Sequence, residues 1–311
     1  MSEDSLSKNL RAAKKNKEDE FYTQLEDINK ELQHYKPHFK DKIVYCNCDD
    51  PRISNFFNYF ALNFEHLGLK KLITTCYKNQ DWNLFSTEKS ESAVYLEYEG
   101  DKNNNKVPDP EEIGVHNLTG DGDFRSDESI KLLKQADIVV TNPPFSLFRE
   151  YIDQLIEHKK KFLIIGNINT ISYQNCFKYI KQNKMWLGYN TVRYFEKPDG
   201  TMYETARSFW YTNLDHKKRH EDFVLYKKYN KDEFPKYDNY DAINVNKAID
   251  IPLDYDGLMG VPITFLDKYN PDQFELIGLM ASTTISEFNF GYPYLDGKKL
   301  YARVIIKNKR L

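Results

Sequence analysis

The chain has 311 residues, of which 40% are hydrophobic and 29% are charged, so it can bury one large core or two smaller ones. Its formal net charge of -3 argues against a general nucleic-acid coat protein, although a local basic face would still suffice for phosphate contacts. The four cysteines form no CxxC pair and the seven histidines show no zinc spacing, which predicts reduced thiols and no metal.

The first 19 residues are polar and charged, and they predict a mobile basic arm. Lys14 and Lys15 in this arm are candidate DNA contacts. A helix is predicted over residues 20–35, because apolar residues recur there at helical spacing. These residues are Phe21, Leu25, Ile28 and Leu32.

The next elements predict the start of a parallel sheet. The β-rich run of residues 42–48 predicts a first strand, and residues 70–77 predict a second. Between them, an apolar helical face begins after the cap candidate Ser54 and ends at Gly68, a typical helix stop. A strand, helix and strand in this order are typical of a right-handed βαβ unit.

The middle of the chain continues the alternation of strands and helices. Residues 93–108 predict a hairpin with a polar Asn/Lys tip, and a short strand and loop follow. The remaining predicted elements alternate regularly: a helix at 127–136, a strand at 137–141, a helix at 146–160 and a strand at 160–167. Residues 20–215 are therefore predicted to form a doubly wound α/β sheet that is the catalytic domain.

The last third has a different character. Two β segments are joined by the turn signal Pro198-Asp199-Gly200, and from residue 221 the chain is rich in Tyr, Lys and Asp. Residues 297–310 predict a final pair of β segments. We expect residues 216–311 to complete the fold.

The strongest chemical signal is "DIVVTNPPFSLF", which runs from Asp137 to Phe148. Prolines cannot donate to a sheet ladder, so the strand has to end near Thr141. The loop Asn142-Pro143-Pro144-Phe145 then lies at the carboxyl end of a parallel strand, where open α/β sheets place their ligands.

This loop offers two fixed acceptors, the Asn142 side-chain oxygen and the Pro143 carbonyl. Two close acceptors suit a planar amino group with two hydrogens to donate, and they hold its lone pair in position to attack a methyl group. Phe145 supplies a flat face for a base taken out of a duplex. The alternative is a strand-ending turn in which Asn142 acts only as a cap.

The loop resembles the catalytic loop of amino methyltransferases that use S-adenosylmethionine. The resemblance implies a Rossmann-like, doubly wound mixed sheet of the class I methyltransferases, with insertions for DNA recognition. It also implies cofactor contacts from Asn142, from the acidic-aromatic pair Asp123-Phe124 and from Tyr22-Thr23; the pair could alternatively be a simple turn. The first-strand loop, which lacks the usual glycines, supplies the remaining candidates: Cys46, Asn47, Cys48, Asp49 and Asp50.

The departures from the common pattern are themselves informative. Together, "DEFYTQ", "VYCNCDDPRISNFF", "GDGDFRS", "DIVVTNPPFSLFREY" and "IPLDYDGLMGVPITFL" resemble the EcoRI-type adenine-specific DNA methyltransferases over residues 18–310. The resemblance implies N6 methylation of a flipped adenine in double-stranded DNA by a monomer, within a restriction-modification system. It further implies GAATTC or a related site, and a cognate endonuclease encoded nearby that does not bind directly.

For DNA contacts outside the arm, the candidates are Arg193, Lys217, Lys218 and Arg219; ordinary surface charge is the alternative for each. Two other functions stay open: methylation of a glutamine side chain in a protein, and a DNA-binding methyltransferase fold without activity. No apolar run reaches membrane-spanning length and residues 1–15 do not resemble a signal peptide, so a cytoplasmic location is expected.

Overall fold

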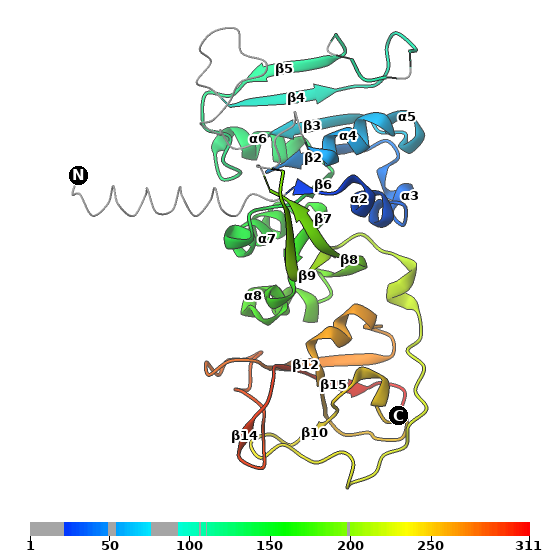
Figure 1. Ribbon diagram of the computed structural model, residues 1–311, viewed down its shortest axis with the longest axis vertical. Coiled ribbons are helices and arrows are strands. Elements are labelled where there is room, and N and C mark those ends of the chain that lie inside the picture. Colours follow the sequence, from blue (N-terminus) through cyan, green and yellow to red (C-terminus); the bar gives the residue numbers. More distant parts are fainter. Residues whose placement is uncertain (1–21, 49–53, 76–92, 106, 110, 198–199) are drawn as a thin grey trace, which may run out of the picture. The chain divides into compact units, whose positions relative to one another are not determined.

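The computed structural model describes residues 22–48, 54–75, 93–105, 107–109, 111–197 and 200–311 (Figure 1). Its contacts divide the chain into two compact units. The first unit comprises Met1–Ile168 and Asn190–Leu214, and the second comprises Asn169–Tyr189 and Asp215–Leu311. The helices in the described ranges include none that is long and apolar enough to cross a membrane.

The first unit is built on a mixed sheet of nine strands among the described residues. The strands in their spatial order are β1 (Tyr22–Thr23), β8 (Trp186–Glu196), β9 (Met202–Thr212), β7 (Lys161–Asn167), β6 (Ile138–Thr141), β2 (Ile43–Asn47), β3 (Lys71–Thr75), β4 (Val94–Tyr98) and β5 (Ile113–Asn117). The four central strands β7, β6, β2 and β3 are parallel, and the flanking pairs β7–β9, β3–β4, β4–β5 and β1–β8 are antiparallel. The predicted doubly wound α/β sheet is confirmed.

Helices cover both faces of this sheet. The apolar face of α4 (Asn55–Leu62) packs in one core cluster with alternate residues of β2, Val44 and Cys46. The other β2 side chains point to the opposite face, where Tyr151 of α7 (Phe148–Glu157) contacts Asn47. The remaining helices of this unit are α2 (Leu25–Leu32), α3 (Lys36–Phe39), α5 (Phe64–Leu67) and α6 (Asp127–Gln135).

The predicted helix between the first two strands is divided. Ser54 caps α4 as expected, because its Oγ accepts from the Phe57 N–H at 3.3 Å, and Gly68 ends α5 with a φ of 64°. The helix is interrupted at Asn63, whose Nδ2 donates to the Tyr59 carbonyl at 2.8 Å. A side chain that bonds to the preceding turn in this way competes with the helical ladder.

Other boundaries differ from the sequence expectations. The first helix begins at Leu25 and not at residue 20, because Tyr22–Thr23 pair with β8 as strand β1. The predicted hairpin and the short strand after it are two halves of one hairpin, since β4 pairs with β5 across the polar tip.

The second unit holds a smaller sheet in the order β10 (Ile243–Asn244), β11 (Met259–Pro262), β15 (Arg303–Asn308) and β12 (Phe274–Met280). It also contains α8 (Gln174–Lys181), a ribbon of β13 (Tyr294–Leu295) with β14 (Lys298–Lys299), and the short 3-10 turns η3 (Lys217–His220), η4 (Ala248–Asp250) and η5 (Ile263–Lys268). Residues 297–310 hold two β segments as predicted, but these strands, β14 and β15, pair with other strands and not with each other. The apolar run of β15 is buried between β11 and β12, and this burial outweighs local pairing with β14.

Candidate active site

The NPPF loop begins where β6 ends, at the carboxyl edge of the parallel strands. The Thr141 hydroxyl donates to the Asn47 carbonyl, which joins the ends of β6 and β2. Asn142 is buried directly after this junction. Pro144 precedes the short 3-10 turn η1 (Phe145–Leu147), in which the Leu147 N–H donates to the Pro144 carbonyl at 3.0 Å. The loop is thereby fixed at both of its ends.

Phe145 connects this loop to β8, the strand that pairs with the predicted site segment Tyr22-Thr23. Its ring lies edge-on to Phe195 of β8, with 5.9 Å between the ring centroids. Phe195 in turn lies opposite Thr23 in the β1–β8 ladder. The Asn55 Nδ2 donates to the Thr23 carbonyl at 2.8 Å, so β1 is held beside the start of α4.

Tyr151 of α7 was not predicted as a site residue, yet it joins two predicted segments. Its hydroxyl donates to the Asn47 Oδ1, and its ring lies edge-on to Phe124 at 5.0 Å. Burial raises the pKa of Tyr151 well above its ordinary value, so the hydroxyl keeps its proton. The helical spacing of the α7 apolar residues indicated only a core position for this tyrosine.

Asp123 is held by its neighbour Arg125, another residue that the sequence reasoning missed. Arg125 donates to the Asp123 carboxylate from Nε at 2.9 Å and from Nη2 at 2.6 Å, and also contacts Glu150. Burial pushes the pKa of Asp123 upward, but the hydrogen bonds from Arg125 outweigh it and the pKa is lowered. Asp123 is therefore a charged acceptor that already has a partner, and not the open carboxylate that the motif suggested.

The glycine-free turn after β2 adopts a conformation that glycine usually supplies. Cys46 and Asn47 are buried, and Cys48 has a φ of 70°, in the left-handed region. Asp49 and Asp50 lie outside the described residues. A cysteine in this left-handed conformation costs roughly 1–2 kcal/mol relative to a glycine.

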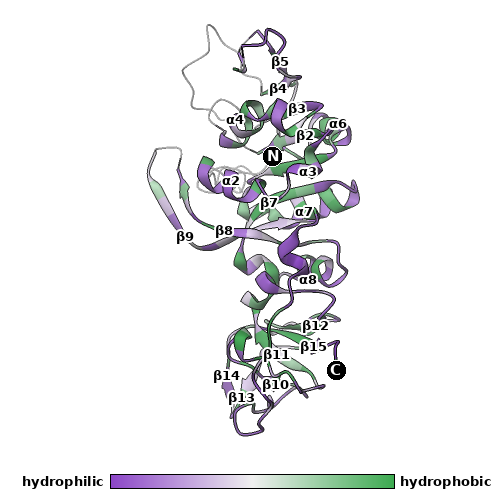
Figure 2. Ribbon diagram, turned by 90° about the vertical axis from the view of Figure 1, so that its right-hand side faces the viewer, coloured by the Kyte–Doolittle hydropathy of each residue, from purple (hydrophilic) through white to green (hydrophobic). Residues whose placement is uncertain are grey.

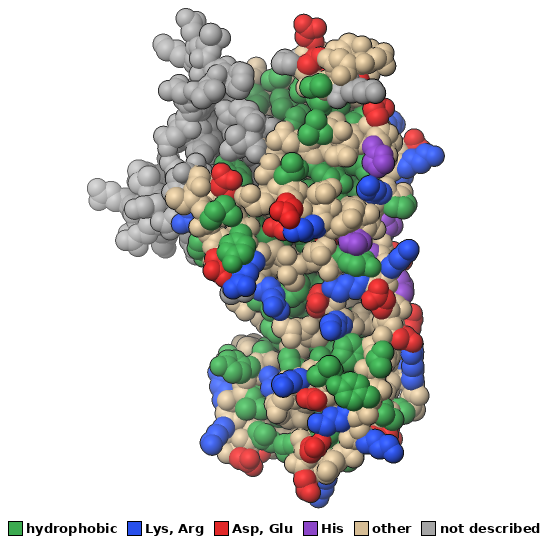
Figure 3. All heavy atoms as spheres, turned by 45° about the vertical axis from the view of Figure 1, so that its right-hand side comes forward, with side chains coloured by type: hydrophobic (Ala, Val, Ile, Leu, Met, Phe, Trp, Pro, Cys, Tyr) green, Lys and Arg blue, Asp and Glu red, His purple; other side chains and the backbone are tan. Residues whose placement is uncertain are grey.

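The predicted DNA contacts occupy different environments. Lys14 and Lys15 lie outside the described residues. Arg193 is exposed on the β8–β9 hairpin, which Figure 2 shows as mostly hydrophilic, and its Nε donates to Glu204 at 2.6 Å. On the face shown in Figure 3, Lys and Arg side chains alternate with Asp and Glu among the described residues. The charge there is mixed.

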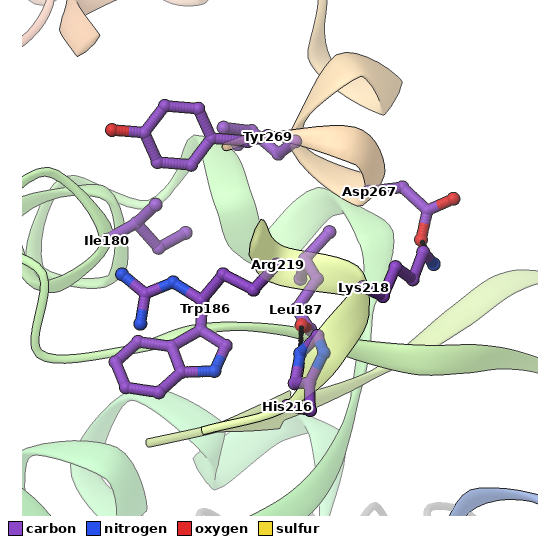
Figure 4. Close-up of a pocket in the computed structure, with 9 residues that line it drawn as sticks. Ile180, Trp186, Leu187, His216, Lys218, Arg219, Asp267 and Tyr269 are labelled. Atoms are coloured by element: carbon purple, nitrogen blue, oxygen red, sulfur yellow. Dashed lines mark hydrogen bonds and ion pairs between the residues drawn. The ribbon is translucent and has the colours of Figure 1, made fainter. Parts of the chain in front are cut away.

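The three basic residues of η3 lie in the second unit. Lys217 is exposed, whereas Lys218 donates to Asp267 at 2.7 Å. Arg219 is buried and lies 3.6 Å above the Trp186 ring, at one side of a pocket that His216 and Tyr269 also line (Figure 4). Lys218 and Arg219 therefore stabilise this pocket, in addition to any contact that they make with a ligand.

A search of the described ranges for three or more His, Cys, Asp or Glu side chains placed to hold a metal ion finds none. The residues predicted to bind the methyl donor are placed as such a site requires in two respects. The left-handed turn at Cys48 brings the backbone after β2 to the edge where ligands bind, and the Asn47 and Thr141 contacts join it to the NPPF loop.

Comparisons with known proteins agree with this arrangement. The family model described as "Adenine-specific methyltransferase EcoRI" matches residues 9–309. The chain is 51% identical to the type II methyltransferase M.EcoRI of Escherichia coli, with 100% of this chain and 99% of that protein covered. It is 39% identical to M.MgeORF184P of Mycoplasma genitalium, with 96% and 98% covered, and 37% identical to M.MpnI of Mycoplasma pneumoniae, with 96% and 97% covered; both are type II methyltransferases. No solved structure matches the chain.

Proposed function

The chain belongs to the EcoRI family of adenine-specific methyltransferases, and from this premise we propose that it methylates N6 of adenine in double-stranded DNA. The methyl group comes from S-adenosylmethionine, and the reaction serves a restriction-modification system that acts on GAATTC or a related site. The observation that carries the proposal is the NPPF loop, fixed at the carboxyl edge of β6 beside the end of β2.

The loop performs the chemistry by holding the amine. The two N–H groups of the adenine amine donate to the Asn142 Oδ1 and the Pro143 carbonyl, and its lone pair then points at the methyl carbon. The new N–C bond forms as the C–S bond breaks, and a proton leaves the cationic amine afterwards for solvent. No base has to remove that proton first, so this step draws on position and fixed dipoles.

The base reaches the loop by leaving the duplex, which costs a few kcal/mol. Phe145 is half-buried and is supported from behind by Phe195, so it offers a fixed ring for stacking. Exposed basic residues offset part of the cost through contacts with phosphates. Arg193 and Lys217 are suited to this role, together with Lys14 and Lys15 of the N-terminal arm.

The residues that would hold the methyl donor are Asn47 and Cys48 through their backbone groups, the Asp123-Phe124 pair, and Tyr22-Thr23 of β1. The Asp123 carboxylate would accept from the amino group of the donor's adenine while it keeps its contact with Arg125. We further propose that the protein acts as a monomer in the cytoplasm and that residues 216–311 contribute to recognition of the DNA target. A cognate endonuclease would be encoded nearby and would not bind the protein directly.

Replacement of Asn142 tests the proposal at its centre. The Asn142→Ala variant should lose about 100-fold or more of its methylation rate, because one of two positioning acceptors is removed. Calorimetric titration should show nearly unchanged S-adenosylmethionine affinity. Asn58→Ala, an exposed change on α4, is the matched control and should methylate normally. A near-normal rate for Asn142→Ala would refute the role assigned to that residue.

A further inference from the structure

The loop between β4 and β5 has a spacing of oxygen-bearing residues that the methyl-transfer site does not use. The sequence reads "DKNNNKVPDPEE" from Asp101 to Glu112. The 12-residue calcium loop of EF-hands takes ligands from positions 1, 3, 5, 7, 9 and 12, position 7 through its backbone carbonyl. Those positions hold oxygen donors of the required kinds: Asp101, Asn103, Asn105, the Val107 carbonyl, Asp109 and Glu112.

The described side chains of this loop converge on one another. The amide nitrogens of Asn103 and Asn105 both donate to the Asp109 Oδ2, at 2.6 and 3.1 Å. The Asn105 N–H donates to the Asp101 Oδ1 at 3.2 Å. These contacts link four of the six ligand positions in one chain of hydrogen bonds.

Glu112 is the buried carboxylate of the loop, and one of its oxygens has no hydrogen-bond partner among the described residues. This carboxylate is 8% exposed, and its Oε1 accepts from the backbone N–H groups of Lys102 at 2.6 Å and Asn103 at 3.1 Å. Its other oxygen, Oε2, is buried and has no hydrogen-bond partner among the described residues. A buried carboxylate oxygen without a partner is unfavourable, and a hard cation would satisfy it.

We propose that residues 101–112 form a calcium site that closes the β4–β5 hairpin. The ligand set supplies about seven oxygens when Glu112 binds through both of its own, which lies within the preference of Ca²⁺. Three carboxylates more than offset the double positive charge of the ion. The site is separate from the methyl-transfer site, in the loop between β4 and the edge strand β5.

Two features of the loop determine its expected affinity for calcium. The carboxylates alone form no metal cluster in the described residues, so the ion requires the amide and backbone oxygens as well. The sequence also has Lys106, which lies outside the described residues, where the EF-hand loop has its invariant glycine. A dissociation constant of about 10⁻⁴ to 10⁻³ M, typical of the weaker calcium modules, is therefore expected.

Tyr98 gives the site an optical reporter. Tyr98 lies opposite Ile113 in the β4–β5 ladder, and Ile113 directly follows Glu112. The phenol is therefore at the same end of the hairpin as the proposed ligands, from where it can transfer excitation to a bound lanthanide. Terbium luminescence excited through tyrosine therefore reports occupancy of this loop.

The test uses the full chain after removal of metals with a chelator. Titration with CaCl₂ alone should show one site by calorimetry and should raise the unfolding temperature, while MgCl₂ at the same ionic strength should do neither. TbCl₃ should give tyrosine-sensitised emission that CaCl₂ displaces. The absence of calcium binding up to about 10 mM, ten times the weak limit of such modules, would overturn the proposal.

Variants separate the site from nonspecific charge. Glu112→Gln should weaken calcium binding about tenfold or more, and Asp109→Asn, at a half-buried position, should do the same if Glu112→Gln fails to fold. Glu111→Gln removes a neighbouring carboxylate from a position outside the ligand set and should bind calcium normally. Equal weakening by Glu111→Gln and Glu112→Gln would also overturn the proposal.

Discussion

Tyr151 connects motifs that lie far apart in the sequence. Its hydroxyl reaches Asn47 at the end of β2, and its ring supports Phe124 of the acidic-aromatic pair. The motif residues could be recognised from the sequence because each stands at the end of a strand or in a loop. Tyr151 could not, because a buried aromatic at helical spacing is typical of any core helix.

The Tyr151→Phe variant should therefore weaken both stability and methyl-donor binding. Removal of the hydroxyl leaves the buried Asn47 Oδ1 without its donor, which should cost about 1–3 kcal/mol in the free energy of unfolding. Denaturant unfolding and calorimetric titration with S-adenosylmethionine measure the two effects. The exposed Tyr226→Phe is the control, and identical behaviour of the two variants would contradict this role.

His216 makes the stability of the second unit dependent on pH. Burial, with further repulsion from Lys218 and Arg219, lowers its pKa from 6.5 to about 4, and its Nε2 hydrogen-bonds with the Leu187 carbonyl at 3.0 Å. Between pH 6.5 and about pH 4, His216 is protonated in the unfolded chain but stays neutral in the folded state. Stability from this group is complete above pH 6.5 and is lost as the pH falls toward 4.

A pH series of denaturant unfolding checks this expectation. Wild type should lose more stability between pH 7 and pH 4 than the His216→Gln variant, whose side chain does not titrate. A direct NMR titration of His216 should show no protonation near pH 6.5. If both proteins lose the same stability between pH 7 and pH 4, His216 does not cause the loss, and carboxylates elsewhere in the chain do.

At the scale of elements, the central parallel strands were predictable because they are apolar and nearly continuous. The strands β6 and β7 are buried along most of their length, which is typical of a sheet covered on both faces. The short strand β1 was not predictable, because two residues carry no periodic signal and its pairing with β8 depends on contacts distant in sequence. The partner of β15 was missed for the same reason.

The helix α4 illustrates how an element positions the site. It starts just after the turn that follows β2, and Ser54 caps its first turn. Ser54→Ala should lower the free energy of unfolding by about 0.5–2 kcal/mol, whereas Ser54→Thr, which keeps the hydroxyl, should lose less. Thermal unfolding measures both, and a neutral Ser54→Ala would show that the cap does not stabilise the helix.

At the scale of the whole molecule, the family match covers both units, from residue 9 to residue 309. The fold of the first unit and the NPPF loop could be inferred from the sequence, because strand ends and prolines are local signals. The partner of Asp123 and the burial of Arg219 follow only from the side chains that the structure places. That residues 20–215 carry out catalysis while residues 216–311 contribute to DNA recognition stays a prediction.

The central claim is that this protein methylates N6 of adenine in DNA. The most direct measurement incubates the chain with duplex DNA and S-adenosylmethionine carrying a labelled methyl group, then digests the DNA and separates its nucleosides. The account predicts that the label appears in N6-methyldeoxyadenosine and is absent when Asn142→Ala replaces the wild type. Label in a cytosine, or in an added protein substrate and not in DNA, would contradict it.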